Sequence, residues 1–596
     1  MRRDGEHLEH AGDGGEDPVA ASPGHFDRRR FNLLLAAVGA SLPAALWAED
    51  EAPEITREVV RAAEQLAGLE LTDDERDLML AGLTDLRADY RAVRAVAPGN
   101  EVAPAQSFAV LPAPQRDTPG PMRRSAVSVG EAPRDLEELA FRPVTELAEL
   151  LRRRQVTSVA LTRMYLGRLE RWNDLLECVV TLTSERAMAQ AEAADREIAA
   201  GRWRGPLHGV PWGAKDLLAV KGYPTTWGAE PYREQRLDTD AAVVRRLDDA
   251  GAVLVAKLTL GALAWGDVWF GGKTRNPWNP EQGSSGSSAG SASATAAGLV
   301  AFAIGTETWG SIVSPSTRCG VTGLRPTFGR VSRTGAMALS WTMDKIGPIA
   351  RSVEDCALVF DVLHGADPPP VGDPTAVDRS FRWDAEGDPR RLKVGYTRSL
   401  FEKPLDEDAD QAAEEVRAMD LAALAKLRQL GVELLPFELP SDLPVSHLSY
   451  ILSAEAAAAF DHLTLSGDDD RLVRQIANAW PNVFRQARTI PAVEYLQASR
   501  VRRQVMERME EALGDLDAYV VPSFGGNHLL LTNLTGHPTV VVPHGFKTDG
   551  TPASISFVGR LWGESDALRL AKLYQDGTDF HSRRPDLAAV ETRKTD

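Results

Sequence analysis

One segment of the chain, residues 283–315, limits the possible folds more than any other. It reads GSSGSSAGSASATAAGLVAFAIGTETWGSIVSP, in which an apolar run joins two loops of small residues. Glycine allows such loops to reach positive φ and to approach a ligand closely. The apolar run at 299–304 predicts a buried strand between the loops. A flexible Gly/Ser linker is the alternative, but a linker would not contain a buried strand. We therefore interpret the segment as a binding or catalytic site.

Composition excludes several classes of function. The chain has 596 residues, of which 43% are hydrophobic and 26% charged, as in ordinary globular proteins. Its net charge of −18 argues against binding to a nucleic-acid backbone, which requires clustered Lys and Arg. The three cysteines, Cys178, Cys319 and Cys356, form neither a disulfide framework nor a metal-ligand pattern. We expect no nucleic-acid partner, no metal and no cofactor.

The N-terminus has the features of an export signal. Arg28, Arg29 and Arg30 precede an apolar run at 33–48, which is too short to span a bilayer but fits the core of a signal peptide. Paired arginines before such a run are typical of the twin-arginine route. We expect residues 1–48 to be a twin-arginine-type signal peptide, the protein to be periplasmic or extracellular, and no membrane span to remain after cleavage. A disordered basic tail and an uncleaved anchor are the alternatives.

The rest of the chain divides into four parts. Residues 49–97 predict a helical hairpin, because apolar residues recur at helical spacing and Thr72 and Glu75 form a capping box. After residue 141 helices and short apolar strands alternate, which favours a largely parallel or mixed sheet covered by helices. The predicted parts are the helical hairpin 49–97, a Pro-rich linker 98–140, a catalytic domain 141–585 and a tail 586–596.

Two kinds of serine chemistry fit the residues. Residues 286–290 match G-x-S-x-G, which would make Ser288 a nucleophile that needs a histidine base. The candidates for that base are His447, His462, His537 and His544. However, the residues before the motif read as loop, whereas this motif follows a strand. The other candidate base is Lys215, because a buried lysine can be neutral enough to accept a proton.

Three blocks of sequence resemble the amidase signature family. PLHGVPWGAKDLLAVKGYPTT, at residues 206–226, is similar to the catalytic-lysine block of that family. Residues 276–298 and 305–315 resemble its Gly/Ser signature, and residues 319–337 resemble the segment that follows it. Ser287 and Ser311 are 24 residues apart, as are the two serines of the family. The resemblance extends over residues 141–585.

The resemblance implies a fold and a mechanism. The fold would be α/β, a large mixed twisted sheet covered on both faces by helices, here with an N-terminal helical extension. Ser311 would be the nucleophile, and Ser287, after a cis peptide bond, would bridge it to a neutral Lys215. An acyl-enzyme would form and water would hydrolyse it. The oxyanion hole would consist of the backbone N–H groups of Thr308, Trp309, Gly310 and Ser311.

The sequence departs from the family at several positions. Trp309 replaces a glycine, and Val313 replaces a frequent arginine that holds a substrate carboxylate in some members, which argues against short acidic substrates. We interpret Glu307, in place of the usual Asp, as structural. Trp309, Ile312 and Val313 together favour an apolar or aromatic acyl group.

The leading functional prediction is that the protein hydrolyses a non-peptide amide C–N bond in a small-molecule substrate. One allowed assembly is a homodimer. A second reading is the glutaminase-type A subunit of a tRNA-dependent amidotransferase. A third is a binding protein on an amidase scaffold, since fold alone does not fix function.

Overall fold

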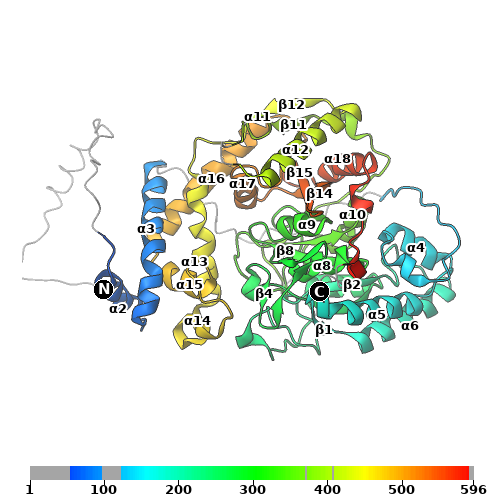
Figure 1. Ribbon diagram of the computed structural model, residues 1–596, viewed down its shortest axis with the longest axis horizontal. Coiled ribbons are helices and arrows are strands. Elements are labelled where there is room, and N and C mark those ends of the chain that lie inside the picture. The colour runs from blue at the N-terminus through cyan, green and yellow to red at the C-terminus, as the bar shows by residue number, and fades with distance from the viewer. Residues whose placement is uncertain (1–53, 97–121, 369–371, 406–408, 590–596) are drawn as a thin grey trace, which may run out of the picture. The chain divides into compact units, whose positions relative to one another are not determined.

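A mixed sheet of eleven strands lies at the centre of the computed structural model (Figure 1). Two groups of three strands are parallel, one centred on β2 and the other on β11, and the remaining neighbours are antiparallel. The predicted mixed sheet is therefore confirmed. In spatial order the strands are β1 (Val179–Leu182), β3 (Val253–Leu258), β2 (Pro211–Lys215), β8 (Phe302–Glu307), β10 (Lys345–Ala350), β9 (Thr322–Arg325), β14 (Thr539–Phe546), β15 (Pro552–Gly559), β13 (Ala518–Pro522), β11 (Val394–Thr397) and β12 (Leu434–Phe437).

The structure describes residues 54–96, 122–368, 372–405 and 409–589. From Thr56 onward the chain forms one compact unit. The predicted signal peptide and much of the predicted linker lie outside the described residues. The described end of that linker packs on the domain, where the backbone N–H of Ser125 donates to the Glu354 carboxylate at 2.8 Å. No helix among the described residues is long and apolar enough to cross a membrane.

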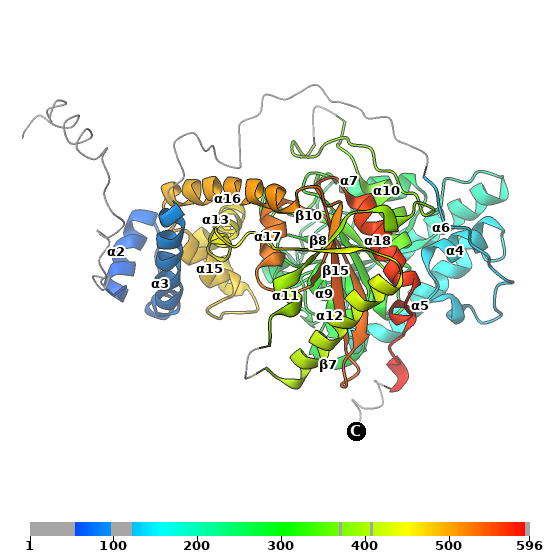
Figure 2. The same ribbon diagram turned by 90° about the horizontal axis from the view of Figure 1, so that it is seen from above.

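Helices cover both faces of the sheet, as expected (Figure 2). Successive strand residues point to opposite faces, so Phe302 and Ile304 of β8 join one apolar cluster and Ala303 joins another. The first cluster includes side chains of α10 (Val353–Leu363) and α18 (Glu564–Asp576). The second includes side chains of α6 (Ser184–Ala199) and α8 (Ala289–Ala296). Further helices around the sheet are α4 (Val144–Arg152), α5 (Ser158–Leu176), α7 (Ala242–Asp249), α9 (Val313–Cys319), α11 (Arg398–Glu402), α12 (Gln411–Gln429) and α17 (His528–Thr535).

The predicted hairpin is present as α2 (Arg57–Ala67) and α3 (Asp73–Val96). Thr72 and Glu75 form the expected capping box, because the Thr72 N–H donates to the Glu75 carboxylate at 2.6 Å and the Glu75 N–H donates to Thr72 Oγ1 at 3.3 Å. α3 packs against two helices from the far end of the chain. They belong to a helical layer made of α13 (Tyr450–Ala459), α14 (Asp461–Ser466), α15 (Trp480–Ala487) and α16 (Ala492–Leu513).

Candidate active site

Sheet topology places Lys215 beside the end of β8. β2 and β8 are parallel neighbours in which Ala214 pairs with Ile304. Because the carboxyl ends of parallel strands lie at one edge of a sheet, Lys215 and Thr306 meet there. Lys215 Nζ donates to Thr306 Oγ1 at 2.8 Å. The sequence analysis did not identify Thr306, because only the register of the two strands brings it to the lysine.

The loop that opens α8 brings two serines to the same amine. Lys215 Nζ donates to Ser287 Oγ at 2.8 Å and to Ser288 Oγ at 3.1 Å. The peptide bond between Gly286 and Ser287 is cis. α8 can approach β8 this closely because Gly305 lacks a side chain: a Cβ there would lie 2.8 Å from Ser288 Oγ.

Burial controls the protonation of Lys215. The residue is fully buried, and this burial lowers the pKa of its amine well below the ordinary value of 10.5. Asp344 and Glu307 act in the opposite direction, but their effect on the pKa is smaller. The partners of the amine are hydroxyl and carbonyl oxygens, none of them charged. A neutral amine in this position can accept a proton.

Ser311 lies in the tight loop between β8 and α9, next to Gly310, whose φ is +88°. The backbone N–H of Ser288 donates to the Ser311 carbonyl at 3.2 Å, which joins the two serine loops. Ser311 is mostly buried, with 9% of its surface exposed. Among the described residues no hydrogen bond joins the Ser287 and Ser311 hydroxyls.

Among the described residues, the backbone N–H groups of residues 308–311 donate no hydrogen bond. The next two N–H groups, of Ile312 and Val313, donate instead to the Glu307 carboxylate at 2.8 and 2.9 Å. Glu307 therefore fixes the start of α9 directly after Ser311.

Glu307 is itself held in place by two buried partners. Its carboxylate accepts from Arg325 at 2.7 Å and from the Asn533 amide at 2.9 Å. Burial alone would raise the pKa of Glu307, but Arg325 and the Val313 N–H outweigh it and lower this pKa to about 2. These contacts agree with a structural role for Glu307.

One expectation about substrate contact is wrong. Ile312 and Val313 are completely buried, and Ile312 belongs to a small apolar cluster between α8, α9 and the sheet. Neither side chain can therefore touch a substrate. Trp309, which is 44% exposed, remains available.

The arrangement around Ser288 does not match a serine–histidine pair. Besides contacting Lys215, the buried Ser288 hydroxyl donates to the Thr306 carbonyl at 3.1 Å. The four candidate histidines are engaged with other side chains: His447 with Asp89, His462 with Tyr232, His537 with Thr535 and His544 with Asp420.

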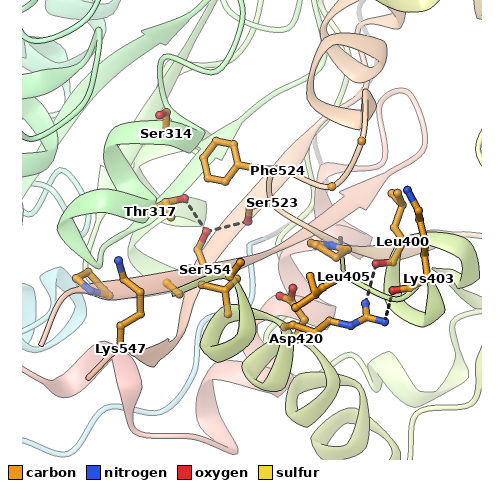
Figure 3. Close-up of a pocket in the computed structure, with 18 of the residues that line it drawn as sticks. Ser314, Thr317, Leu400, Lys403, Leu405, Asp420, Ser523, Phe524, Lys547 and Ser554 are labelled. Atoms are coloured by element: carbon orange, nitrogen blue, oxygen red, sulfur yellow. Dashed lines mark hydrogen bonds between the residues drawn. The ribbon is translucent and has the colours of Figure 1, made fainter. Parts of the chain in front are cut away.

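A large cavity, which we call the α9 cavity, begins one helical turn after Ser311 (Figure 3). Its volume is about 570 Å³ and it is lined by residues of α9, α12 and the loop after β13. Ser314 lies at its edge and the exposed ring of Phe524 lies on its wall. A chain of hydroxyls from Thr317 through Ser554 to Ser523 lines its floor, with oxygen separations of 2.6 and 2.8 Å.

A second cavity, which we call the β8 cavity, is lined by residues of β8, of β10 and of the segment between β9 and β10. Its volume is about 320 Å³, and Thr306 and Thr308 both line it. Asp344 is at its wall and accepts a 2.5 Å hydrogen bond from Thr308 Oγ1. The sequence analysis missed Asp344, because it is 36 residues from Thr308 and nothing in the local pattern links the two.

A family model described as "Amidase" matches residues 160–568. The chain belongs to the amidase signature family. It is therefore an amidase-family enzyme, a hydrolase of C–N bonds. The match covers both serines and Lys215, and the observed sheet agrees with the fold expected from the resemblance.

Individual relatives of this amidase are similar over most of their length. The A subunit of the glutamyl-tRNA(Gln) amidotransferase from Methylococcus capsulatus is 33% identical, over 74% of this chain and 98% of the relative. The protein of the same name from Roseiflexus sp. is 35% identical, over 74% of this chain and 98% of the relative. The crystal structure of the native peptide amidase from Stenotrophomonas maltophilia has 29% identity and a TM-score of 0.65, over 74% of this chain and 98% of that one.

Proposed function

We propose that this amidase hydrolyses the C–N bond of a small, non-peptide amide through Ser311, Ser287 and Lys215. The observation that carries the proposal is the 2.8 Å hydrogen bond between Ser287 Oγ and the fully buried Lys215 amine, whose pKa burial lowers. Ser287 is thereby connected to a group that can act as a base.

The proposed reaction begins with two proton transfers. Neutral Lys215 accepts the proton of Ser287 while Ser287 accepts that of Ser311, and Ser311 Oγ attacks the amide carbonyl carbon. The backbone N–H groups of 308–311 stabilise the oxyanion, where each donor commonly contributes about 3 kcal/mol to the transition state. Ser287 then donates a proton to the amide nitrogen and regains one from Lys215, so that the lysine is neutral again, the C–N bond breaks, and the amine leaves. Water hydrolyses the acyl-enzyme and restores Ser311.

Three variants test this mechanism on a panel of aliphatic and aromatic amides. Ser311→Ala and Lys215→Ala should lose at least about a thousandfold in kcat/KM, as expected when a nucleophile or its base is removed. Ser288→Ala should retain turnover, reduced by the loss of one hydrogen bond to Lys215. Labelling by a fluorophosphonate should place the phosphonyl group on Ser311, identified by mass spectrometry. Abolition of turnover by Ser288→Ala, with Ser311→Ala still active, would contradict the mechanism.

The glutaminase-type component of a tRNA-dependent amidotransferase is the second candidate, because relatives with that name are 33% and 35% identical. The net charge of −18 and the proposed export signal weigh against it. Co-purification with tRNA and the other amidotransferase components, and glutaminase activity that depends on them, would favour this candidate. The remaining candidate, a binding protein, would show no Ser311-dependent labelling.

We also propose that the enzyme is exported by the twin-arginine route. The support is the arginine pair Arg28–Arg29 and the short apolar run at 33–48.

A further inference from the structure

We propose that Asp344 is a positioning residue for the reaction, because its carboxylate holds the Thr308 hydroxyl and thereby orients the backbone N–H groups of residues 308–311. This inference rests on the proposed function, in which those N–H groups stabilise the oxyanion. Asp344 itself touches none of the reacting atoms and acts through Thr308 and through its charge.

The loop 308–311 is held by a carboxylate at each end. At its far end, Glu307 accepts from the first two N–H groups of α9. At its near end, Thr308 Oγ1 donates to Asp344 Oδ1 at 2.5 Å. The next side chain, that of Trp309, is 44% exposed and makes no hydrogen bond among the described residues. The contact with Asp344 is therefore the one that fixes the near end of the loop.

Strand register brings Asp344 to Thr308. β10 is antiparallel to β8, and Lys345, its first residue, pairs with Glu307. Asp344 precedes Lys345 and Thr308 follows Glu307, so continuing the antiparallel register places Asp344 opposite Thr308. Thr308 is buried, and a buried hydroxyl needs a hydrogen-bond partner, which Asp344 provides.

The carboxylate of Asp344 is itself held in place. Its Oδ2 accepts from the backbone N–H groups of Leu339 and Ser340 at 2.8 and 2.9 Å. The same segment is attached to α13, because Ser340 Oγ donates to the buried Glu455 carboxylate at 2.6 Å. Asp344 accepts in all three of its hydrogen bonds, which favours its ionised form.

The charge of Asp344 also acts on Lys215. Burial lowers the pKa of Lys215, and of the two carboxylates that oppose this effect Asp344 raises the pKa more than Glu307 does. Burial raises the pKa of Asp344 itself, whereas its hydrogen bonds and the nearby Arg333 lower it. The adjacent Lys345 directs its amine to a backbone carbonyl. Removal of the Asp344 charge should therefore lower the pKa of Lys215 further.

The rate at which a fluorophosphonate labels Ser311 tests the proposal without a known substrate. Ser311 Oγ bonds to phosphorus, fluoride leaves, and the phosphoryl oxygen takes the place of the oxyanion. Asp344→Asn should lower the second-order labelling rate constant at least about tenfold, as expected when an oxyanion donor is displaced. It should also move the acid midpoint of this rate constant to lower pH, because Lys215 stays neutral to lower pH. The matched control Asp373→Asn removes a carboxylate of the same cavity that pairs with Arg333, and it should change neither quantity.

A second pair of variants separates the hydrogen bond from the charge. Thr308→Val removes the hydroxyl but leaves the Asp344 charge in place, so it should slow labelling at least about tenfold and keep the wild-type acid midpoint. Thr308→Ser retains the hydroxyl and should label at close to the wild-type rate. Thr334→Val, the matched change elsewhere in the cavity wall, should label as wild type does. This pair also tests the proposal if Asp344→Asn does not fold by circular dichroism.

A wild-type labelling rate in Asp344→Asn or Thr308→Val would overturn the proposal. An acid midpoint of Asp344→Asn that stays in place or moves to higher pH would also overturn it, as would equal losses of rate in the control variants. These results leave the proposed function intact as long as labelling disappears in Ser311→Ala. Labelling that persists in Ser311→Ala would overturn the proposed function and this inference together.

Discussion

At the residue scale, two buried lysines differ in the groups that contact them, and this difference decides which lysine can accept a proton. Lys257 and Lys215 are both completely buried. Lys257 contacts the Asp216 carboxylate at 2.6 Å, and both side chains are fully inaccessible, so the pair is a structural ion pair. Lys215 contacts only hydroxyl and carbonyl oxygens. No charged group contacts Lys215 to offset the free-energy cost of burying its protonated form. Lys215 is therefore the better proton acceptor of the two lysines.

The pH dependence of kcat/KM should follow the protonation of Lys215. The neutral amine is the active form, so activity should fall on the acid side as Lys215 gains a proton. Because burial lowers the pKa of Lys215 well below 10.5, the acid limb should have its midpoint far below that value. Lys215→Arg should be inactive across the range, since arginine stays protonated. Initial rates at limiting substrate between pH 5 and pH 10 provide the measurement.

A stability measurement checks the same pKa independently of activity. In wild type the unfolded chain binds a proton on Lys215 that the folded chain has released, at any pH between the lowered folded pKa and about 10.4. The free energy of unfolding should therefore rise with pH over this interval. Lys215→Met lacks this contribution, so the urea midpoint of wild type relative to the variant should increase from pH 7 to pH 9. No change in that difference would mean that Lys215 is charged in the folded protein.

At the element scale, the α2–α3 hairpin joins the N-terminal part of the described chain to the helical layer. Glu75 of the hairpin pairs with the buried Arg485 of α15 at 2.6 Å. The side chains of Asn482 and Gln486 donate to the backbone carbonyls of Leu78 and Met79 at 3.0 and 3.1 Å. These contacts explain why a hairpin too short to be stable alone is ordered here.

The packing of α3 predicts that substitutions at two adjacent residues lower the free energy of unfolding by different amounts. Met79 is 1% exposed and Leu78 is 36% exposed. Met79→Ala should cost about 2–5 kcal/mol of unfolding free energy, because it leaves a cavity against α15, whereas Leu78→Ala should cost much less. Urea unfolding followed by circular dichroism compares the two. Equal losses of unfolding free energy in the two variants would show that the buried face of α3 does not stabilise the protein.

Elements differed in how well the sequence predicted them. The hairpin could be read from apolar spacing, and α2 and α3 both lie within the predicted 49–97. α13 to α15 were not predicted, because their alanine-rich or short segments carry little periodic signal and are stabilised mainly by tertiary packing. Residues 279–283, read as loop, form β7 (Asn279–Gly283), a short strand paired with β6 (Arg275–Asn276).

At the scale of the whole molecule, the proposed export of the enzyme can be tested on cells. The full chain should be found in the periplasm or the medium, with an N-terminus that lies after the apolar run at 33–48. Replacing Arg28 and Arg29 by lysine should retain the protein in the cytoplasm, because the twin-arginine route requires the pair. Cell fractionation and N-terminal sequencing provide the readout. A cytoplasmic wild-type protein that keeps Met1 would contradict the proposal.

The sequence by itself determined the family and the mixed α/β architecture, and its resemblance to the family indicated Lys215, Ser287 and Ser311 as candidate residues, because that resemblance rests on local motifs. Only the tertiary structure showed that Thr306 contacts Lys215, that Asp344 contacts Thr308, and that Ile312 and Val313 are buried. It also showed that Ser314 lines one cavity and that Thr306 and Thr308 line another. The physical reason is that burial and strand register depend on residues far apart in the chain. Burial and register in turn decide the pKa of a buried lysine and the shape of a pocket.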